Sequence, residues 1–484
     1  MDNELSHKRM KKILITKKYA WLLLVIAAAI CCIYASLLLP SWISWQEKNF
    51  TSESGIECLL EKRRVKLYDE SGKNFWSSGK ELKVQDAFIT DIDRNGDEEL
   101  ILLLWKRGRF GNERPFWING DEISYSQHIF IYNISENKEV TSKWFASDIG
   151  RLVTRMKLVD RDNTIILTED RKDENTLWVW SSFGLRNIDN EVKFAAFGDN
   201  IIHKTIYEYA YNYKDGNFDF LYEPFADEIE NADIASIQAE TVLVDKMAAV
   251  SGYPQFGSPI AVGDAIKKAG FDIAVCGNNH ALDKGIYGIN VTTSFYKKND
   301  ILCVGIQNSE DTKYRPYEII TRNGIKFAIF SYTYGTNGMD ASDKYPNAVH
   351  YIPRTEEEKK KCASDIEKAK QEADFIVVYA HWGDEYTKSI SDAQREFAYL
   401  LCDAGVDVII GTHPHVLQYM QTLEREDGGE TLVYYSLGNF RADQKQDEAT
   451  MIGGEAYFIV EHTFDGVRIK EYELKEIDSV VHKQ

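Results

Sequence analysis

The stretch "VDVIIGTHPHV", residues 406–416, is an apolar run that stops at Gly411 and then presents His413 and His415 on either side of Pro414. A short run rich in valine and isoleucine is typical of a buried β-strand. Alternate residues of an extended chain point to opposite faces, whereas a turn at Pro414 would bring both imidazoles round to one side. We therefore expect a buried strand whose end carries two metal-binding side chains.

Similar apolar runs alternate with helical patterns from about residue 191 to 478. Runs such as "VKFAAFGD", "FDIAVCGNNH" and "DFIVVYAHWG" are separated by patterns such as "GSPIAVGDAIKKAG" and "SDAQREFAYLLCDAG". Gly270 and Gly405 stand where two of the helices should end, because glycine readily adopts the left-handed conformation of a C-terminal cap. This alternation of strand and helix predicts an α/β domain with covered sheets.

Five of the apolar runs finish in residues that bind metals. In open α/β sheets, ligands lie outside the carboxyl ends of the strands. Any one such residue has an ordinary alternative, as a helix cap, a turn residue or a loop histidine. The chain has ten histidines, however, and four of them stand at these ends, so the joint pattern indicates one site. The residues are Asp199, Glu240, Asn279, His280, His381, His413 and His415.

The donor set indicates which ions would bind. Carboxylate, amide and imidazole groups without a thiolate suit Mn²⁺, Fe or Zn²⁺ rather than a structural zinc. Two such ions, about 3.5–4 Å apart, share an oxygen ligand, activate a water molecule and stabilise the oxygens of a phosphoryl displacement. We therefore expect two divalent metal ions, with His413 and His415 on separate ions.

The order of motifs GD, QAE, "GNNHALDKG", "HWGDEY", "GTHPHV" and "YYSLGNF" resembles the CapA family, the poly-γ-glutamate capsule biosynthesis proteins of the calcineurin-like metallophosphoesterase superfamily. The resemblance covers about residues 192–462 and includes "TYGTNG" at 333–338. It implies a sandwich of two β-sheets flanked by helices. It also implies that His280 protonates the leaving group or stabilises the transition state, with Asp283 orienting it. The implied metal ligands are Asp199, Glu240, Asn279, His381, His413 and His415.

The chain departs from the superfamily pattern around the first metal. An Asp-x-His pair usually opens the site, but Ile201 stands two residues after Asp199. His203 is a candidate to replace the missing imidazole or to contact substrate. Glu240 stands where the superfamily has its bridging Asp, and Gln238 stands where CapA-like proteins usually have Asn. Both Gln238 and His203 are therefore candidate metal or substrate contacts.

The N-terminal part predicts a membrane anchor. Residues 19–40 carry no charge and are numerous enough to cross a bilayer as a helix. Six lysines and arginines precede them within residues 1–18, a pattern that keeps that end in the cytoplasm. A cleaved signal peptide and a buried core helix are the alternatives. We expect an uncleaved single-pass anchor in the cell membrane, with the bulk of the chain outside the cell.

Residues 45–190 are rich in short alternating segments and predict a mostly-β domain. Within it, "DIDRNGDEEL" (91–100) has oxygen-bearing side chains at alternate positions and a glycine for a sharp turn, as calcium loops do. The loop resembles those of FG-GAP-type β-propeller repeats, which implies a propeller-like domain; the alternative is an acidic turn without an ion. The candidate calcium ligands are Asp91, Asp93, Asn95, Asp97 and Glu99.

Composition limits the partners. The 484 residues carry a net charge of −19, which disfavours nucleic acid, because such binding needs a basic surface. The seven cysteines form no C-x-x-C pair, so a disulfide framework is not expected.

The sequence favours a membrane-anchored extracytoplasmic hydrolase, with two metal ions, that acts on a phosphoester or a cell-envelope polymer. The resemblance implies a role in poly-γ-glutamate or capsule biosynthesis. One alternative is a non-catalytic metal-binding component of a polymer synthase or export complex, with synthase subunits as partners. Another is an adhesion or sensor module whose working part is the β-rich region.

Overall fold

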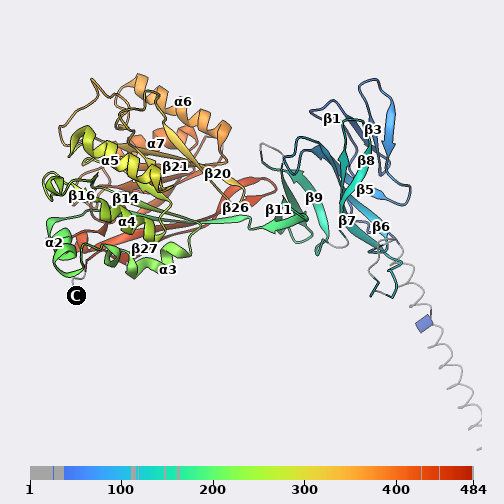
Figure 1. The fold of residues 1–484 in the computed structure, drawn as a ribbon, viewed down its shortest axis with the longest axis horizontal. Coiled ribbons are helices and arrows are strands. Elements are labelled where there is room, and N and C mark those ends of the chain that lie inside the picture. Colours follow the sequence, from blue (N-terminus) through green and yellow to red (C-terminus); the bar gives the residue numbers. More distant parts are fainter. Residues whose placement is uncertain are drawn as a thin grey trace, which may run out of the picture. The chain divides into compact units, whose positions relative to one another are not determined.

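The protein is described here by a computed structural model, in which the chain divides into two compact units, residues 1–188 and 189–484 (Figure 1). None of the helices within the described ranges is long and apolar enough to cross a membrane. The predicted tail (1–18) and anchor (19–40) lie outside those ranges, apart from residues 25–26 and 38–40, so both stay predictions. The structure describes residues 25–26, 38–110, 116–117, 119–146, 149–160, 164–426, 428–445 and 447–481.

One sheet of the second unit has seven strands in the order β18-β17-β14-β13-β26-β27, with β25 beside β13. The first four strands in this order are parallel, and β26 and β27 continue the sheet as an antiparallel hairpin. The strands are β13 (Glu191–Asn200), β14 (Ile234–Ala239), β17 (Ile273–Val275), β18 (Leu302–Val304), β25 (Asn439–Arg441), β26 (Ile452–Thr463) and β27 (Gly466–Asp478).

The other sheet has six strands in the order β19-β20-β21-β22-β24-β23. Its four central strands are parallel, and the edge strands β19 and β23 are antiparallel to their neighbours. Two further short strands, β15 (Leu243–Val244) and β16 (Ser258–Pro259), pair with each other. The six strands are β19 (Tyr317–Arg322), β20 (Ile325–Thr333), β21 (Phe375–His381), β22 (Val408–Thr412), β23 (Met420–Glu424) and β24 (Glu430–Tyr434).

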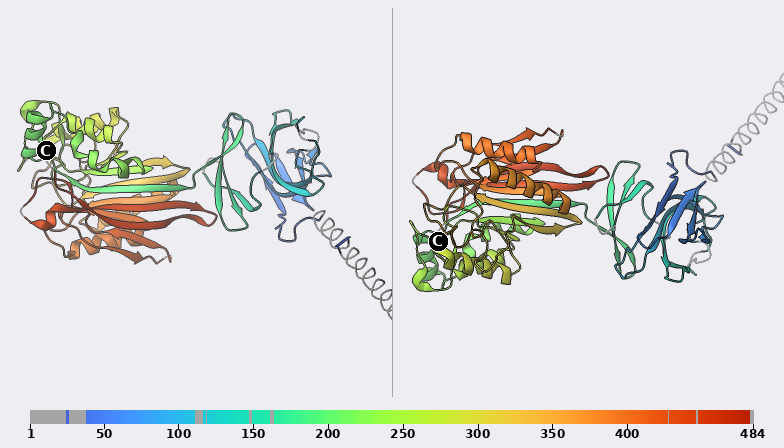
Figure 2. Two further views of the ribbon diagram at one scale, coloured as in Figure 1. Left: turned by 90° about the horizontal axis from the view of Figure 1, so that it is seen from below. Right: turned by 90° about the horizontal axis from the view of Figure 1, so that it is seen from above.

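Helices cover the outer faces of the two sheets (Figure 1; Figure 2). Helices α4 and α7 end at Gly270 and Gly405, whose φ angles of 99° and 90° are left-handed, as the sequence predicts. The α-helices are α2 (Lys204–Tyr213), α3 (Ala226–Glu230), α4 (Ile260–Ala269), α5 (Gly285–Lys298), α6 (Glu356–Glu372) and α7 (Asp392–Ala404). The short 3₁₀ helices are η2 (Asp219–Leu221), η3 (Glu223–Phe225), η4 (Met247–Ala249) and η5 (Glu448–Met451).

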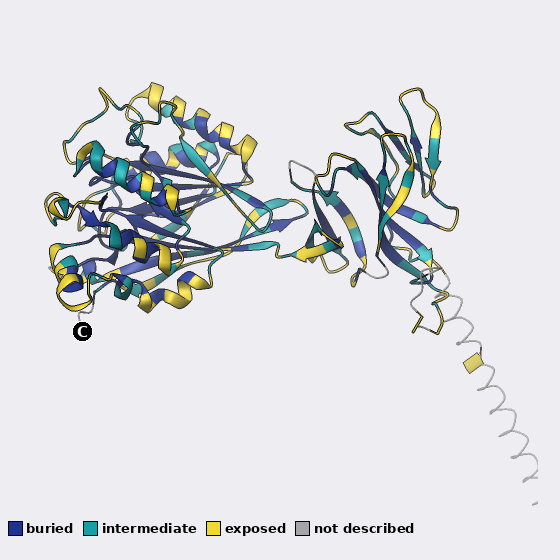
Figure 3. Cartoon of the chain, viewed as in Figure 1, coloured by how far each residue is buried: buried dark blue, intermediate teal, exposed yellow. Residues whose placement is uncertain are grey.

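Three hydrophobic layers hold this sandwich together. In β13, Phe194 joins the core between the two sheets, while Phe197 joins the core under α2, α4 and α5. A third core lies between the second sheet and helices α6 and α7 and includes Phe330 and Phe397. Figure 3 shows the result, with buried strands inside and exposed residues on the outer faces of the helices. The predicted α/β sandwich of two helix-flanked sheets is therefore confirmed.

The first unit consists of three four-stranded antiparallel meanders, β1–β4, β5–β8 and β9–β12. The middle meander is buried on both faces: alternate residues of β6, such as Leu102 and Leu103, belong to two different cores. The mostly-β prediction is confirmed, and each meander has the strand order of a propeller blade, while the propeller itself stays a prediction. The strands are β1 (Lys48–Thr51), β2 (Glu57–Glu61), β3 (Arg64–Tyr68), β4 (Asn74–Ser77), β5 (Lys83–Thr90), β6 (Glu99–Arg107), β7 (Tyr125–Ile134), β8 (Val140–Phe145), β9 (Val153–Leu158), β10 (Ile165–Asp170), β11 (Asn175–Ser181) and β12 (Gly184–Ile188).

Candidate metal centre

The candidate ligands come together at the carboxyl ends of strands from both sheets. Asp199 lies near the end of β13, Glu240 directly follows β14, and His381 is the last residue of β21. The backbone can pack this tightly because Gly198 has no side chain. A Cβ atom there would lie 2.1 Å from the carbonyl oxygen of Gly438. Two of the motifs that the sequence shows far apart, GD and SLGNF, therefore meet beside Asp199.

The turn after β22 presents its two histidines through an uncommon backbone. His413 and His415 have φ angles of 97° and 58°, in the left-handed region that non-glycine residues seldom occupy. The backbone N–H of Tyr386 donates a hydrogen bond of 2.8 Å to the carbonyl of Pro414 and holds the turn. The imidazole rings are 5.8 Å apart between centroids. Both point toward the Asp199 and Glu240 region, as the sequence predicts for a turn at Pro414.

Two of the candidate ligand groups share Glu240 and contain one of the two imidazoles each. One is Asp199, Glu240 and His415, and the other is Glu240, His381 and His413; a third group joins both imidazoles to Glu385. Within each group the ligand atoms lie within 4.8 Å of one another. The Oε1 atom of Glu240 lies 3.7 Å from Nε2 of His381 and 3.9 Å from Nε2 of His415. Glu240 thus has the position of a carboxylate shared by two ions.

The buried charges of these groups fit divalent cations. Asp199 and Glu240 are fully buried. Within the described residues, both oxygens of Glu240, Oδ1 of Asp199 and Nδ1 of His413 have no hydrogen-bond partner. Among the residues that the structure describes, neither carboxylate pairs with a lysine or an arginine. Because a buried carboxylate is stable only when it is paired or coordinated, this donor set suits metal ions.

The ionisation of these side chains responds to the same burial. Burial and the neighbouring Asp199 carboxylate raise the pKa of Glu240 well above its usual value. Burial lowers the pKa of His413 to about 3 and that of His381 well below its usual value. The imidazoles are therefore neutral near pH 7, the form in which histidine binds metals.

Asn279 and His280 lie in the loop after β17, on one side of this centre. The Oδ1 atom of Asn279 is 2.9 Å from Nε2 of His381, so the amide joins the second ligand group. The side chain of Asn278 holds the loop by donating to the carbonyl of Ala239 and accepting from the backbone N–H of His280. The structure thus brings Asn279 to the other five predicted ligands, while their role as ligands stays a prediction.

His280 and Asp283 form a buried pair. Nδ1 of His280 donates to Oδ2 of Asp283 at 2.7 Å, and the backbone N–H of Phe256 donates to the same oxygen at 2.6 Å. The edge of the Phe256 ring packs on the imidazole at 4.8 Å between centroids. This arrangement fixes the orientation of the ring. The contact with Asp283 uses Nδ1, so Nε2 is the ring nitrogen that takes no part in the pair. Asp283 thus has the orienting position that the resemblance implies.

The residues at which the sequence departs from the superfamily pattern, His203, Gln238 and Ile201, lie close to the metal centre. His203 precedes α2 and lines the cavity that opens onto the metal centre. Its Nδ1 accepts a hydrogen bond of 3.2 Å from the backbone N–H of Asp443. Burial lowers the pKa of His203 to about 4. Gln238 is next to Asp199 in strand register, and its buried amide has no hydrogen-bond partner. Ile201 is buried at the cavity wall.

The structure adds residues that the sequence did not single out. The Glu385 carboxylate lies within 4.8 Å of His413 and His415. The Tyr334 ring lies 4.6 Å from that of His413, and the Tyr386 ring lies 5.8 Å from that of His415. The signal for them was present, because they belong to the motifs HWGDEY and TYGTNG.

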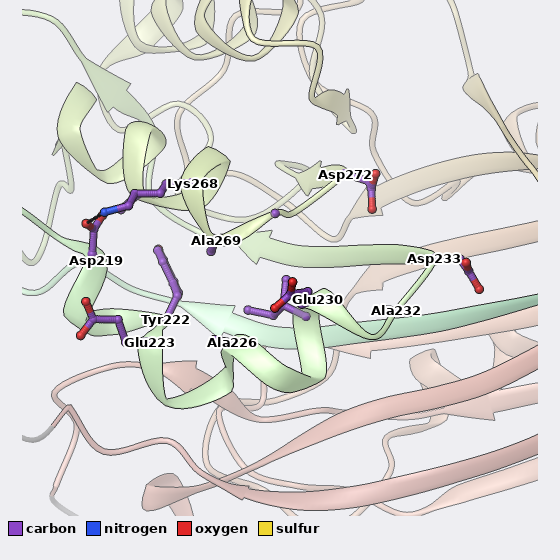
Figure 4. A pocket seen from close by; sticks show the side chains of 13 residues that line it. Asp219, Tyr222, Glu223, Ala226, Glu230, Ala232, Asp233, Lys268, Ala269 and Asp272 are labelled. Atoms are coloured by element: carbon purple, nitrogen blue, oxygen red, sulfur yellow. Dashed lines mark hydrogen bonds and ion pairs between the residues drawn. The ribbon is translucent and has the colours of Figure 1, made fainter.

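A cavity of about 820 Å³ opens onto the centre. It is lined by Glu240, Asn279, His280 and His415 from the centre, and also by Glu385, Tyr386 and residues 253–256. A second cavity of about 570 Å³, drawn in Figure 4, is lined by side chains such as Asp219, Glu223 and Lys268. The described residues that line it include no histidine, and Asp219 pairs with Lys268 (Figure 4). The larger of these two cavities is therefore the one that carries the candidate chemistry.

The predicted calcium loop forms the turn between β5 and β6. Asp91, Asp93 and Glu99 converge there, with ligand atoms within 4.8 Å of one another. Asp91 accepts hydrogen bonds from the backbone N–H groups of residues 95 and 96, and Asn95 accepts one from that of Asp97. The ammonium group of Lys143, from β8, pairs with both Asp93 and Glu99. Calcium binding therefore stays a prediction, and an ion would have to displace this ammonium.

The fold and the site together define a class, the α/β sandwich proteins that carry a candidate two-metal centre at their strand ends. Within it, the chain belongs to the family of the bacterial capsule synthesis protein PGA_cap, whose model matches residues 193–444. These residues contain all six candidate ligands. The family assignment agrees with the CapA resemblance seen in the sequence.

Known relatives agree with the family. The chain is 36% identical to the PGA biosynthesis protein CapA of Bacillus subtilis (strain 168) over 182 residues, which are 37% of this chain and 44% of that protein. It is 35% identical to the capsule biosynthesis protein CapA of Bacillus anthracis over 37% of this chain and 42% of that protein. The matches thus span less than half the length of these relatives. Among solved structures, the calcineurin-like phosphoesterase YfkN from Bacillus subtilis aligns with 60% of this chain and 91% of that chain, at 14% identity and a TM-score of 0.34.

Proposed function

We propose that the second unit is a metal-dependent hydrolase that cleaves phosphoesters. The observation that carries this proposal is the pair of ligand groups that share Glu240, a fully buried carboxylate to which none of the described residues donates a hydrogen bond. Asp199, Glu240 and His415 would hold one divalent ion, and Glu240, Asn279, His381 and His413 the other. Bound there, two ions of Mn, Fe or Zn supply Lewis acidity and a water molecule of lowered pKa.

His280 has the position of the proton donor. Hydrolysis forms a bond from a water oxygen to phosphorus and breaks the bond to the leaving oxygen, which must take up a proton. The imidazolium form of His280 donates that proton from Nε2, and the Asp283 carboxylate at Nδ1 stabilises the positive charge. Phe256 packs on the His280 ring and keeps it in place. Asn279, the residue before His280, contacts His381 and so holds the loop after β17 beside the candidate ligands.

His280→Ala tests this proposal. We expect phosphodiester turnover to fall roughly 10²–10⁴-fold, because general acid catalysis contributes that much. Metal content should stay at two equivalents, since His280 is not in either ligand group. The matched control is His462→Ala, a buried histidine of β26 outside the cavity, which should keep both properties. Elemental analysis and phosphate release from a phosphodiester and from a phosphomonoester measure the two effects. Wild-type protein with two metals and no turnover on either substrate would contradict the proposal.

The cellular setting is part of the same proposal. The uncharged segment 19–40 after a basic tail supports a single-pass anchor in the cell membrane, with the enzyme outside. The names of the two CapA relatives, which refer to PGA and capsule biosynthesis, support a role in the biosynthesis of poly-γ-glutamate or another capsule polymer. The substrate would then be a component of the cell envelope.

A second candidate is a non-catalytic metal-binding component of a polymer synthase or export complex. The word biosynthesis in the relatives' names favours it, because assembly does not require hydrolysis. The two candidates differ at His280. A scaffold would show no turnover for His280→Ala to remove, and its binding to synthase subunits in a pull-down would depend on surface residues instead.

A further inference from the structure

The wall of the cavity beside His280 is aromatic and exposed. The Tyr253 side chain is 80% exposed and lines the cavity, and its ring lies 6.3 Å from that of Phe256. Phe256 in turn packs its edge on His280. An unbroken row of rings therefore leads from the proposed proton donor out to solvent. Because His280 protonates the leaving oxygen, this row lies where the leaving group must pass.

A second tyrosine faces the same space. Tyr386 is 46% exposed, and its ring lies 5.8 Å from that of His415 between centroids. Its φ of 61° is left-handed, a conformation that costs free energy in a non-glycine residue and that clusters at functional sites. Tyr386 and Tyr253 line the same cavity.

Acids and amides make up much of the polar lining of this cavity, beside its three histidines. Glu385, Gln255, Asn337 and Gln444 belong to this lining, and among the described residues that line the cavity there is no lysine or arginine. A polyanion such as poly-γ-glutamate would meet carboxylates here without any cationic side chain to pair with. Aromatic faces surrounded by carboxylate and amide groups suit a different ligand, a neutral ring that carries many hydroxyl groups. Its C–H faces stack on tyrosine, and its hydroxyls donate to and accept from the acids and amides.

We propose that Tyr253 and Tyr386 form a subsite for a sugar ring, so that the leaving group of the phosphoester is a glycosyl unit. This inference rests on the proposed function and names its substrate class. Water adds to phosphorus, the phosphorus–oxygen bond to the sugar breaks, and the sugar oxygen takes the His280 proton. Glu385 and Gln255 select the ring by hydrogen bonds to its hydroxyls.

Binding and turnover together test the subsite. In the metal-loaded His280→Ala background, Tyr253→Ala should weaken binding of glucose 1-phosphate roughly 3- to 10-fold by isothermal titration calorimetry, because ring stacking is lost. Binding of ethyl phosphate, which has no ring, should weaken less. With His280 present, the ratio of KM for glucose 1-phosphate to KM for ethyl phosphate should rise by a similar factor in Tyr253→Ala and in Tyr386→Ala. Matched controls are Tyr213→Ala (75% exposed) and Tyr472→Ala (46% exposed), which should change neither substrate.

The outcomes separate the two proposals. Ethyl phosphate turnover with equal effects of Tyr253→Ala on both ligands would overturn the sugar subsite and leave the hydrolase standing. Selective loss of glucose 1-phosphate binding without turnover of either substrate by the wild type would support the subsite and overturn the hydrolase. Thermal unfolding of Tyr253→Ala checks that the fold is intact, and we expect no change because the side chain is exposed.

Discussion

Two clusters in this protein each contain aspartate and glutamate side chains, but among the described residues only one of them contains a positively charged side chain. At the metal centre, Asp199 and Glu240 are fully buried and pair with no lysine or arginine in the described part of the chain. At the β5–β6 turn, Asp93 and Glu99 share the ammonium group of Lys143. Although burial lowers the pKa of Lys143, hydrogen bonds to the two acids raise it above its usual value.

The difference shows how each cluster meets the cost of burying a carboxylate. Water stabilises an ionised acid far better than a protein interior does, so each buried acid needs a cation or must take up a proton. The first unit supplies a cation from its own sequence. The second unit supplies imidazoles, which are metal ligands and bring no fixed positive charge of their own. Acids at a turn are therefore weak evidence for an ion until the cationic side chains around them are known.

The largest expected effect comes from the shared carboxylate. Glu240→Gln keeps the shape of the side chain and removes its charge, so both ions lose a ligand. We expect metal content to fall well below two equivalents and phosphodiester turnover to fall about 1,000-fold or more. Elemental analysis and phosphate release measure this. Glu357→Gln, an exposed residue of α6, is the control and should change neither. Retention of two metals by Glu240→Gln would show that the ions do not depend on this carboxylate, and would contradict its assignment as the shared ligand.

The second effect reverses the arrangement at the β5–β6 turn. Lys143→Met leaves the buried Glu99 without its cation and should destabilise the first unit by about 3 kcal/mol. Addition of millimolar Ca²⁺ should restore much of the lost stability, because the three acids could then share an ion. Urea unfolding with and without Ca²⁺ measures both. The control is Lys80→Met, an exposed lysine at which we expect little change. A Ca²⁺ effect on the wild type equal to that on the variant would contradict the comparison.

His350 is a third buried ionisable group, and within the described ranges it has neither a charged side-chain partner nor a place in the candidate ligand groups. His350 is buried, Nδ1 of its ring has no hydrogen-bond partner among the residues that the structure describes, and burial lowers its pKa to about 3. Between pH 6.5 and 3 the unfolded chain binds a proton at this residue and the folded chain does not. Stability therefore falls as the pH falls, by about 1.4 kcal/mol per pH unit from this group. Wild type should lose that much more stability than His350→Leu between pH 6 and 5 in urea unfolding. Parallel losses would show that His350 does not titrate in this way.

Much of the sandwich could be predicted from local pattern. The apolar runs became buried strands, and Gly270 and Gly405 ended helices, because both signals depend on a few adjacent residues. The meeting of Asp199 with His415 could also be predicted, since parallel strands gather their ends at one edge of a sheet. Residue spacing could not predict that β26 and β27 extend the sheet at β13, because that pairing joins segments more than 250 residues apart.

The remaining site residues depend on tertiary structure. Lys143 lies 44 positions after Glu99 in the chain. The sequence of the loop therefore does not predict the ion pair between them. Glu385 and Tyr386 face the centre because of a turn at Tyr386 with positive φ, which an ordinary residue type does not reveal. Tyr253 is a candidate site residue because its ring packs on Phe256, which packs on His280. The sequence does not predict this packing.

The most direct test of the central claim is an anomalous-diffraction map of a crystal of the wild-type protein grown with Mn²⁺. We predict two Mn²⁺ peaks per chain, one among Asp199, Glu240 and His415 and the other among Glu240, His381 and His413, with the ammonium group of Lys143 still between Asp93 and Glu99. A map without peaks at these two positions, or with its only peak at the β5–β6 turn, would contradict the account.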